Sequence, residues 1–583
     1  MVFGDLLSSG FSFVMNLMKI FASLLVSLPV LITISLVLRD PPPDRIKGFA
    51  DARVLETPSS PVTTSSNIEI FRRPAPVSNI TSSNSAENVL PEIELPTQIP
   101  KEDKLYDGLL APAFDEGSCL SRYQSSFYRK ISTHKPSSYL LSRLRSYEEL
   151  HKRCGPNSKP YSASLKQLKK KFNGTSTGAT DECKYVVWIA NSGLGNRILS
   201  ITAAFLYALL TNRVLLLDPG KDLPDLFCEP FPETSWLLSN HFPIKSHFDK
   251  FDQKSPRCYG NMLKKTSNSS ELSLPSSYVY LHLGHDYDQQ DKLFFCDEEQ
   301  SHLGKVDWLV MKTDNYFVPS LFLMPSFEQE LNKLFPERET VFHHLGRYLF
   351  HPSNHVWGLI TRYYQASLAK ADEMVGIQVR TFEPAGPGPF KHVMDQILAC
   401  VFSEKLLPRV DENKPIVDFS SSSGTPKLKS VLMTSLKPDY SENLRSMYWE
   451  HPTVNGDLIG VFQPSHEGEQ RTDDKLHDRK ALAEMFLLSF SDVLVTSAWS
   501  TFGYVAQGLG GLKPWILFKP ENQTVPNPPC RRLQSMEPCF HAPPLWDCKE
   551  KRGTDTGAIV PHVRHCEDIS WGLQLIDTHN DHL

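Results

Sequence analysis

The sequence predicts an α/β protein whose two successive halves each contain a parallel β-sheet. Short apolar, β-branched runs alternate with amphipathic helical patterns, which is typical of β-α-β units and parallel sheets. Each half also holds a turn rich in glycine or serine between a strand and a helix. The length of 583 residues exceeds what a single core supports, because a domain usually takes roughly 100–200 residues.

The first unit surrounds the turn at Ser192–Arg197. An apolar run predicts a strand at Tyr185–Ile189, and apolar side chains at helical spacing predict a helix at Ile198–Leu210. A second strand is predicted at Arg213–Asp218. The turn therefore lies at the carboxyl end of a strand and the amino end of a helix, where such folds bind ligands.

Four residues of this turn suit a ligand. Gly193 and Gly195 let backbone N–H groups approach an anion or a sugar closely, although they do not complete the GxGxxG dinucleotide motif. Asn196 and Arg197 add an amide and a fixed cation. We expect these two side chains to bind the ligand; a plain tight turn with a surface arginine is the alternative.

The N-terminal part predicts a membrane anchor and a stem. Residues 20–38 are apolar and uncharged, close to the roughly 20 residues that cross a bilayer. We expect a cytoplasmic tail at 1–19, an uncleaved signal anchor at 20–38 and a disordered lumenal stem at 39–104, rich in Pro, Ser and Thr. A cleaved signal peptide is the alternative.

Cysteines and glycosylation sequons indicate an oxidising, secretory compartment. All 11 cysteines follow the apolar span, and so do four sequons, at Asn79, Asn173, Asn268 and Asn522. Cysteines that cluster near the C-terminus, such as Cys530, Cys539 and Cys548, add to this reading. The odd count leaves one thiol free or paired between chains, so a homodimer stays open. No cysteine and histidine spacing resembles a zinc site, and a net charge of −5 argues against nucleic-acid binding.

The second half starts near Val375 and repeats the alternation. Strands and helices are predicted, in order, as strand 376–380, helix 390–398, strand 430–434, helix 439–448, helix 480–490, strand 493–496 and strand 515–518. Another helix is expected between the last two strands. Its start, Ser497–Thr501, is the serine-rich counterpart of the first turn.

Several polar residues of the second half are candidates for binding a phosphorylated ligand. Arg380 ends an apolar strand and can fork onto a phosphate, with an interdomain salt bridge as the alternative. Ser497, Ser500 and Thr501 can bind a phosphate at a helix start or merely cap the helix. Glu484 can hold a ribose or sugar hydroxyl, or lie on a solvated helix face.

Two acidic segments of the first half are weaker candidates. Asp286 and Asp288 form a DxD after a strand-like run, a pattern that can hold a divalent metal but is common by chance. Asp314 follows another strand-like run and can act as a base or contact an acceptor hydroxyl. A turn formed by Asp314 and Asn315 is at least as good an interpretation.

Eight stretches of the sequence together indicate a protein family. The chain resembles the plant cell-wall fucosyltransferases, the xyloglucan α-1,2-fucosyltransferase family. The match runs in order from about Cys154 to Leu573, and the stem and the loops at 386–389 and 420–424 depart from it. The matching stretches are CKYVVWIANSGLGNRILS (183–200), ALLTNRVLLLD (208–218), DLFCEPF (225–231), KTDNYFVPSL (312–321), GIQVR (376–380), ENLRSMYWE (442–450), VTSAWSTFGYVAQGLGGLKPW (495–515) and VPHVRHCEDISWGL (560–573).

The resemblance implies a single-pass type II Golgi membrane enzyme with two Rossmann-like domains that face a cleft, the GT-B type. The acceptor-side domain would be 105–364 and the GDP-fucose-side domain 365–583. It also implies transfer of L-fucose from GDP-fucose to a galactose of a cell-wall polysaccharide, xyloglucan first, without a metal cofactor. The family's donor-pocket arginine corresponds to Arg380, its serine and threonine loop to Ser497, Ser500 and Thr501, and its acceptor-side aspartate to Asp314.

The expected chemistry is an inverting transfer with an oxocarbenium-like transition state. Arg380, Arg197 and backbone N–H groups near Ser500 would stabilise the departing diphosphate. Other acceptors remain open, namely arabinogalactan proteins, pectin or a polypeptide. So does a non-catalytic Golgi protein that binds a GDP-sugar.

Overall fold

The computed structural model describes residues 105–172, 182–266, 277–381, 390–413, 426–472, 474–520 and 524–577. The predicted tail, anchor and stem lie outside the described residues, as do the four sequons. None of the helices in the described part combines the length and the apolar character needed to cross a bilayer. All of these residues belong to one compact unit.

The first half of the described chain forms a parallel sheet, as the sequence predicts. Its strands run in the order β2-β1-β4-β3, with β1 (Tyr185–Ile189), β2 (Val214–Leu217), β3 (Tyr278–His282) and β4 (Trp308–Lys312). Nearly every residue of the four strands is buried, because helices or loops cover both faces. Both predicted strands of the first unit are therefore confirmed.

Helices surround this sheet and carry the chain between its strands. The predicted helix after the glycine turn is α5 (Leu194–Leu210), which begins four residues earlier than predicted, inside the turn. The others are α2 (Leu120–Gln124), α3 (Ser138–Cys154), α4 (Lys159–Phe172), α6 (Leu223–Leu226), α7 (Tyr259–Thr266), α8 (Asp297–Leu303), α9 (Val318–Leu321), α10 (Pro325–Leu334), α11 (Val341–Leu349) and α12 (Asn354–Ser367).

The second half forms a sheet in the order β10-β9-β8-β5-β6-β7, parallel except for the antiparallel edge strand β10. Its strands are β5 (Glu373–Gln378), β6 (Leu428–Thr434), β7 (Leu458–Phe462), β8 (Val493–Ser497), β9 (Trp515–Leu517) and β10 (Arg531–Arg532). β5 lies two to three residues before its predicted position, so Arg380 follows the strand instead of ending it. β7 was not predicted.

Four helices connect these strands, and two small hairpins follow. The helices are α13 (Phe390–Ser403), α14 (Asp439–Glu450), α15 (Lys475–Leu488) and α16 (Thr501–Gly510). The hairpins pair β11 (Trp546–Asp547) with β12 (Arg552–Gly553), and β13 (Val563–His565) with β14 (Leu573–Leu575). α15 begins five residues earlier than predicted, because Asp474 caps its N-terminus by accepting from the N–H groups of Leu476 and His477.

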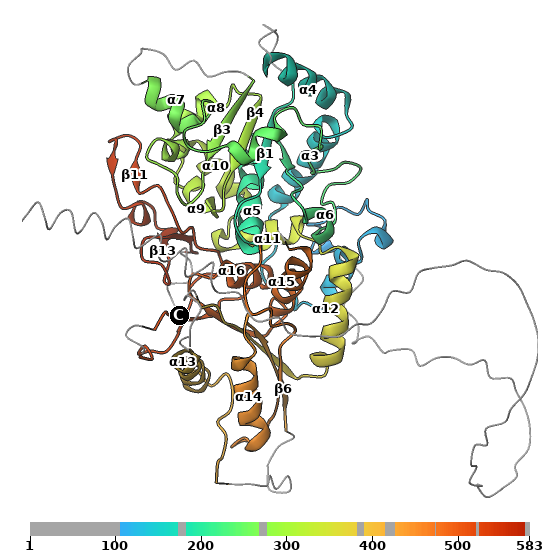
Figure 1. The fold of residues 1–583 in the computed structure, drawn as a ribbon, viewed down its shortest axis with the longest axis vertical. Helices are drawn as coiled ribbons and strands as arrows, with labels where there is room; N and C mark the ends of the chain where they lie inside the picture. Colours follow the sequence, from blue (N-terminus) through green and yellow to red (C-terminus); the bar gives the residue numbers. More distant parts are fainter. Residues whose placement is uncertain are drawn as a thin grey trace, which may run out of the picture. The chain divides into compact units, whose positions relative to one another are not determined.

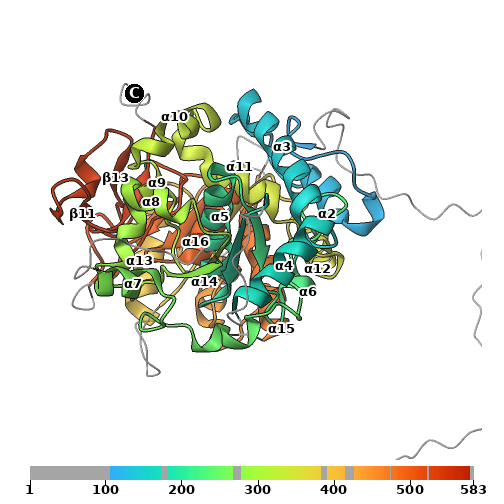
Figure 2. The same cartoon turned by 90° about the horizontal axis from the view of Figure 1, so that it is seen from above.

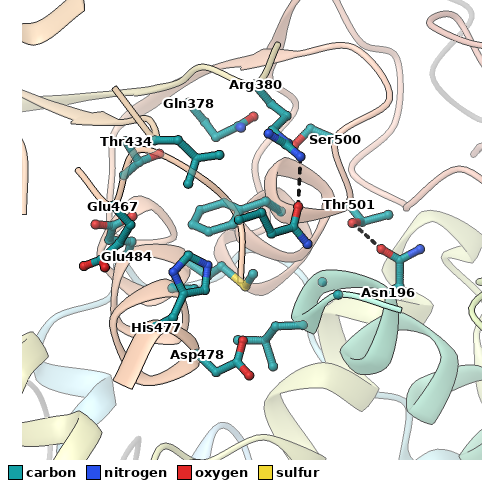
Figure 3. A pocket seen from close by; sticks show the side chains of 18 of the residues that line it. Asn196, Gln378, Arg380, Thr434, Glu467, His477, Asp478, Glu484, Ser500 and Thr501 are labelled. Atoms are coloured by element: carbon teal, nitrogen blue, oxygen red, sulfur yellow. Dashed lines mark hydrogen bonds between the residues drawn. The ribbon is translucent and has the colours of Figure 1, made fainter. Parts of the chain in front are cut away.

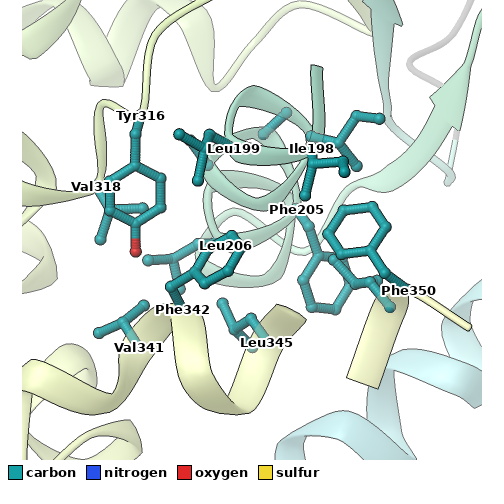
Figure 4. Close-up of a cluster of buried hydrophobic side chains, with 14 of the residues drawn as sticks. Ile198, Leu199, Phe205, Leu206, Tyr316, Val318, Val341, Phe342, Leu345 and Phe350 are labelled. Atoms are coloured by element: carbon teal, nitrogen blue, oxygen red, sulfur yellow. The ribbon is translucent and has the colours of Figure 1, made fainter. Parts of the chain in front are cut away.

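The two sheets share one layer of helices. α5 packs on α16, and α16 also packs on α11 and α15, so these helices lie between the sheets (Figures 1 and 2). Figure 4 shows the side chains of α5 meeting those of α11 in this layer. A single apolar cluster includes Leu206 from the first half and Tyr504 from the second. The predicted domain boundary at 364/365 falls inside α12 and stays a prediction.

Five disulfides join loops and helices of the described part. They are Cys119–Cys228, Cys154–Cys183, Cys296–Cys548, Cys400–Cys530 and Cys539–Cys566. Cys258 is the one cysteine without a disulfide in the described part, and it is fully buried. Burial raises the pKa of its thiol to about 12, so this thiol is poorly suited to a disulfide between chains.

Candidate active site

A cavity of about 370 Å³ lies where the two halves meet. Its walls come from the start of α5, the end of β5, the start of α16, one face of α15 and the loop at 465–472 (Figure 3). The carboxyl ends of β1, β5 and β8 all lead into this region, which is where parallel sheets place their ligand sites. The residues predicted from the two turns therefore come together in one place.

The two turns have the same backbone plan. Ser192 precedes α5 and Trp499 precedes α16, each one residue before the N-cap, with φ angles of 64° and 63°. A left-handed conformation is uncommon for a serine and strained for a tryptophan, and such residues concentrate at functional sites. The turns aim two helix N-termini, with their unpaired N–H groups, at the cavity.

The turns also contact each other directly. Thr501 donates a hydrogen bond from Oγ1 to Asn196 Oδ1 at 3.0 Å, and Asn196 donates from Nδ2 to the backbone oxygen of Asp314 at 3.3 Å. A Cβ added to Gly195 would lie 2.7 Å from Thr501 Oγ1 and 2.9 Å from the Thr501 carbonyl carbon. The absence of a side chain at Gly195 therefore allows this close approach.

Arg380 points into the cavity from the end of the second sheet. Its backbone N–H donates to Ser497 Oγ at 2.9 Å, and its guanidinium Nη2 donates to Gln470 Oε1 at 2.8 Å. Burial lowers the pKa of Arg380, but an arginine stays charged at neutral pH. The predicted cation of the donor site is thus at the cavity, and Gln470 lies in front of it.

Ser497 and Ser500 have partners within the protein. Ser497 is 8% exposed, is absent from the cavity wall, and holds the backbone that carries Arg380. The Ser500 hydroxyl accepts from the N–H of Gly503 at 3.4 Å as the N-cap of α16. Both hydroxyl groups therefore stabilise the fold, through the Arg380 backbone and the start of α16. Ser500 and Thr501 still line the cavity, so their predicted contact with a ligand stays a prediction.

Arg197 lines the cavity floor but is held by two carboxylates. It is 3% exposed, donates to both Asp222 oxygens at 2.7 and 2.9 Å, and donates to Asp478 Oδ2 at 3.0 Å. Burial alone would lower the pKa of Arg197, but these carboxylates raise it. Because Asp222 lies before α6 and Asp478 lies on α15, the cluster joins the two halves. Its predicted contact with a diphosphate stays untested.

Glu484 lies on the cavity side of α15, so the interpretation as a solvated helix face is wrong. Its side chain is 7% exposed and accepts from Ser465 Oγ at 2.6 Å. Burial raises its pKa to about 8, despite that hydrogen bond. At neutral pH the carboxyl group is therefore mostly protonated and can both donate and accept a hydrogen bond.

Asp314 lies just outside the cavity wall, next to Asn196. Its carboxylate accepts from Ser192 Oγ at 3.0 Å, from the backbone N–H of His285 at 2.9 Å and from His285 Nδ1 at 2.7 Å. The hydrogen bond and the charge of Asp314 raise the pKa of His285. His285 was not predicted from the sequence, although it directly precedes the DxD.

The acidic pair Asp286 and Asp288 is engaged by protein groups. His282 Nε2 pairs with Asp286 at 3.0 Å, and Lys264 pairs with Asp288. Among the described residues, the three potential metal ligands that approach one another are Cys539, Cys566 and Asp568, and these two cysteines form a disulfide. A disulfide sulfur is no thiolate ligand.

These features define a class of protein. Two parallel sheets present an arginine and two helix N-termini to one polar cavity, the arrangement typical of proteins that bind a phosphorylated nucleotide or nucleotide sugar. The model of a family described as "Xyloglucan fucosyltransferase" matches residues 77–549. The chain belongs to the xyloglucan fucosyltransferase family, and the resemblance seen in the sequence is confirmed.

Individual relatives agree with this assignment. The chain is 57% identical to "Galactoside 2-alpha-L-fucosyltransferase" of Arabidopsis thaliana, over 98% of this chain and 94% of that protein. It is 57% identical to the protein of the same name from Pisum sativum, over 97% and 93%. A solved structure of a mutant Arabidopsis thaliana FUT1 in complex with GDP is 62% identical, with a TM-score of 0.75, and covers 81% of this chain and 100% of that chain.

Proposed function

We propose that this protein transfers L-fucose from GDP-fucose to a galactose hydroxyl of xyloglucan, with inversion to an α-1,2 linkage. The observation that carries the proposal is Arg380, a cation that lines the same cavity as the N-termini of α5 and α16. The names of the two relatives and the GDP complex of a 62% identical chain support it.

The cavity offers complementary groups for each part of the donor. The diphosphate would lie between Arg380 and the first N–H groups of α16, where a fixed cation and a helix dipole both favour negative charge. The nucleoside would lie in the recess lined by Thr434, Ser465 and Glu484. A protonated Glu484 can donate a hydrogen bond to an acceptor atom of a base or ribose.

The proposed reaction breaks the bond between the fucose anomeric carbon and the β-phosphate oxygen. The electron pair leaves with GDP, so negative charge develops beside Arg380 and the N–H groups near Ser500. The acceptor oxygen attacks the opposite face of the sugar, which converts a β-linked donor into an α-linked product. We propose that these protein groups suffice and that no metal takes part.

The cellular location is a second part of the proposal. We infer a single-pass type II protein of the Golgi membrane with its catalytic part in the lumen. The five disulfides of the described part support an oxidising compartment. Protease treatment of sealed Golgi vesicles tests this: the catalytic part should survive until detergent is added, and digestion in intact vesicles would contradict it.

The activity is tested with the full chain, expressed in a secretory host and purified in detergent. GDP-fucose is offered with unfucosylated xyloglucan, arabinogalactan, pectin and a polypeptide in parallel, each with EDTA. Transfer to xyloglucan in EDTA is the expected result. Transfer only to another acceptor would change the substrate, loss of transfer that Mn²⁺ restores would show a metal requirement, and GDP binding without transfer would favour the non-catalytic alternative.

A further inference from the structure

Both carboxylate oxygens of Asp314 already accept hydrogen bonds from protein groups. The side chain that faces solvent beside Asp314 is that of His285. Oδ1 of Asp314 accepts from the backbone N–H of His285, and Oδ2 accepts from Ser192 Oγ and from His285 Nδ1. Asp314 is 6% exposed, whereas the side chain of His285 is 71% exposed. An incoming hydroxyl group therefore meets the imidazole more readily than the carboxylate.

The hydrogen bond to Asp314 fixes the state of the imidazole. An ionised carboxylate only accepts hydrogen bonds, so Nδ1 of His285 carries the hydrogen that joins the pair. In the neutral ring, the lone pair then lies on Nε2, the atom directed away from Asp314. This is the arrangement that a histidine needs to accept a proton.

The loop that carries His285 is joined to the cavity wall on two sides, on one side through Asp314 and on the other directly. On one side, Asn196 lines the cavity and donates to the backbone oxygen of Asp314 at 3.3 Å. On the other side, Tyr287 donates from its hydroxyl to the backbone oxygen of Ala542 at 2.6 Å, and the neighbouring His541 lines the cavity. His285 therefore lies on a segment held between two walls of the donor cavity.

We propose that His285 is the general base of the transfer and that Asp314 is the residue that positions it, an inference that rests on the proposed function. Nε2 of His285 takes the proton from the galactose hydroxyl while the acceptor oxygen bonds to the fucose anomeric carbon. The bond from that carbon to the β-phosphate oxygen breaks, and its electron pair leaves on GDP. The proton on His285 then passes to solvent, so the products are the fucosylated galactoside, GDP and one proton.

The charged groups around the ring make it a stronger base than a free histidine. The hydrogen bond and charge of Asp314 raise the pKa of His285, its partial burial lowers the pKa, and Asp286 raises it further. Ser192 contacts the same carboxylate without a charge. Turnover should therefore fall on the acid side of the pH profile, where Nε2 of His285 becomes protonated.

The test compares full-length wild type with His285→Gln and Asp314→Asn, by kcat for xyloglucan against pH and by the affinity for GDP. General-base catalysis contributes about 10²- to 10⁴-fold, so His285→Gln should lose about that much kcat and the acid limb, with unchanged GDP affinity. Asp314→Asn should retain an acid limb, moved to lower pH, because the charge that raises the pKa of His285 is gone. Imidazole added to His285→Ala should restore part of the turnover.

His302→Gln is the matched control, because His302 lies in the last turn of α8, which leads into the amino end of β4, whereas His285 follows the carboxyl end of the parallel strand β3. His302→Gln should keep the wild-type kcat, pH profile and GDP affinity. The inference is overturned if His285→Gln keeps kcat within threefold of wild type with the same acid limb, or if both site variants lose GDP binding along with transfer. Absence of transfer by the wild type would instead contradict the proposed function.

Discussion

Two arginines lie at the same cavity, and they differ in burial and in the contacts that hold them. Arg197 follows the first turn, is 3% exposed and holds Asp222 and Asp478 in a buried cluster. Arg380 follows the last residue of β5 by two positions, and its guanidinium contacts the neutral oxygens of Thr381 and Gln470. Both were predicted from sequence to bind the ligand, Arg380 first and Arg197 as a second cation. The difference teaches that a cation at a strand-to-helix corner serves the fold where buried carboxylates hold it, as Asp222 and Asp478 hold Arg197.

The largest effect is expected from Arg197→Met. Removing this cation leaves Asp222 and Asp478 facing each other in a buried site, and breaking such a cluster costs about 3–5 kcal/mol of the free energy of unfolding. Urea unfolding measures the loss. Adding Asp222→Asn and Asp478→Asn to the same chain should recover most of it, because the unpaired charges are then gone. A stable Arg197→Met protein with greatly reduced turnover would instead assign Arg197 to the donor.

Arg380→Ala should lower turnover and leave stability almost unchanged, the reverse of what is expected for Arg197→Met. We expect kcat to fall about 10²- to 10³-fold, or about 3–4 kcal/mol in the transition state, because the charge that develops on GDP loses its cation. The free energy of unfolding should change little. Arg380→Lys is the control that keeps the charge and loses the planar fork, so its turnover should lie between the two. Near-normal turnover of a folded Arg380→Ala protein would exclude the proposed role.

Gly195→Ala tests whether the two turns must touch. The added Cβ would lie 2.7 Å from Thr501 Oγ1, 2.9 Å from the Thr501 carbonyl carbon and 3.0 Å from the Phe502 nitrogen. Two of these atoms are backbone, so the turns must separate, and overpacking of this kind costs about 1–3 kcal/mol. We expect lower stability in urea and weaker GDP binding together.

Gly193→Ala is the matched control for that replacement. Its Cβ would meet only the end of the Gln470 side chain, at 2.7 Å from Nε2, and that side chain can turn away. The stability of Gly193→Ala should remain within about 0.5 kcal/mol of wild type, as at an ordinary surface site. Equal losses in the two variants would show that the contact between the turns has no special importance.

The last effect is a change of stability with pH, and it is the smallest when expressed per pH unit. Burial and the neighbouring Asp222 raise the pKa of Asp478 to about 7, against about 3.9 in an unfolded chain. A carboxyl group whose pKa is raised on folding destabilises the fold once it ionises, so wild-type stability should fall as pH rises from about 4 to about 7, by at most about 1.4 kcal/mol per pH unit.

Asp478→Asn cannot ionise and should show a smaller fall, with the remainder due to groups such as Glu484, whose pKa is also raised; unfolding measurements at several pH values would show the difference. Asp225→Asn is a suitable control, because Asp225 also pairs with α15, through Lys475 and Arg479, but has a lowered pKa. It should keep the wild-type slope between pH 4 and 7. Identical slopes in wild type and Asp478→Asn would contradict the assignment.

Much of the fold could be predicted because buried parallel strands are nearly continuous apolar runs. The prediction at 185–189 coincides with β1, and those in the second half fall within three residues of β5, β6, β8 and β9. β7 was missed, since it is a half-exposed edge strand with Gly460 in its middle, which weakens the strand pattern. Helix starts were placed late where the cap or the turn itself is part of the helix, as at α5 and α15.

The site could be predicted only where local sequence determines position. Asn196, Arg380 and Thr501 reach the cavity because each follows a strand at a sheet's carboxyl edge. The partner of Arg197 on α15 is 281 residues away, and no local pattern reveals such a pair. The contacts of His285 with Asp314 and of Gln470 with Arg380 also join residues far apart in the sequence, so no local pattern reveals them. Two signals were usable: His285 directly precedes the DxD, and it comes shortly after a strand-like run, as Asp314 does.

The disulfide between Cys296 and Cys548 has a consequence for how the chain is made. It joins residues 252 positions apart, from the first sheet's surroundings to the β11–β12 hairpin. At roughly 5–20 residues per second, the second cysteine is synthesised about 13–50 s after the first. During that interval the first half must wait with Cys296 unpaired. A chain that stops short of the hairpin never closes this bond, so closure of the bond reports that synthesis has passed Cys548.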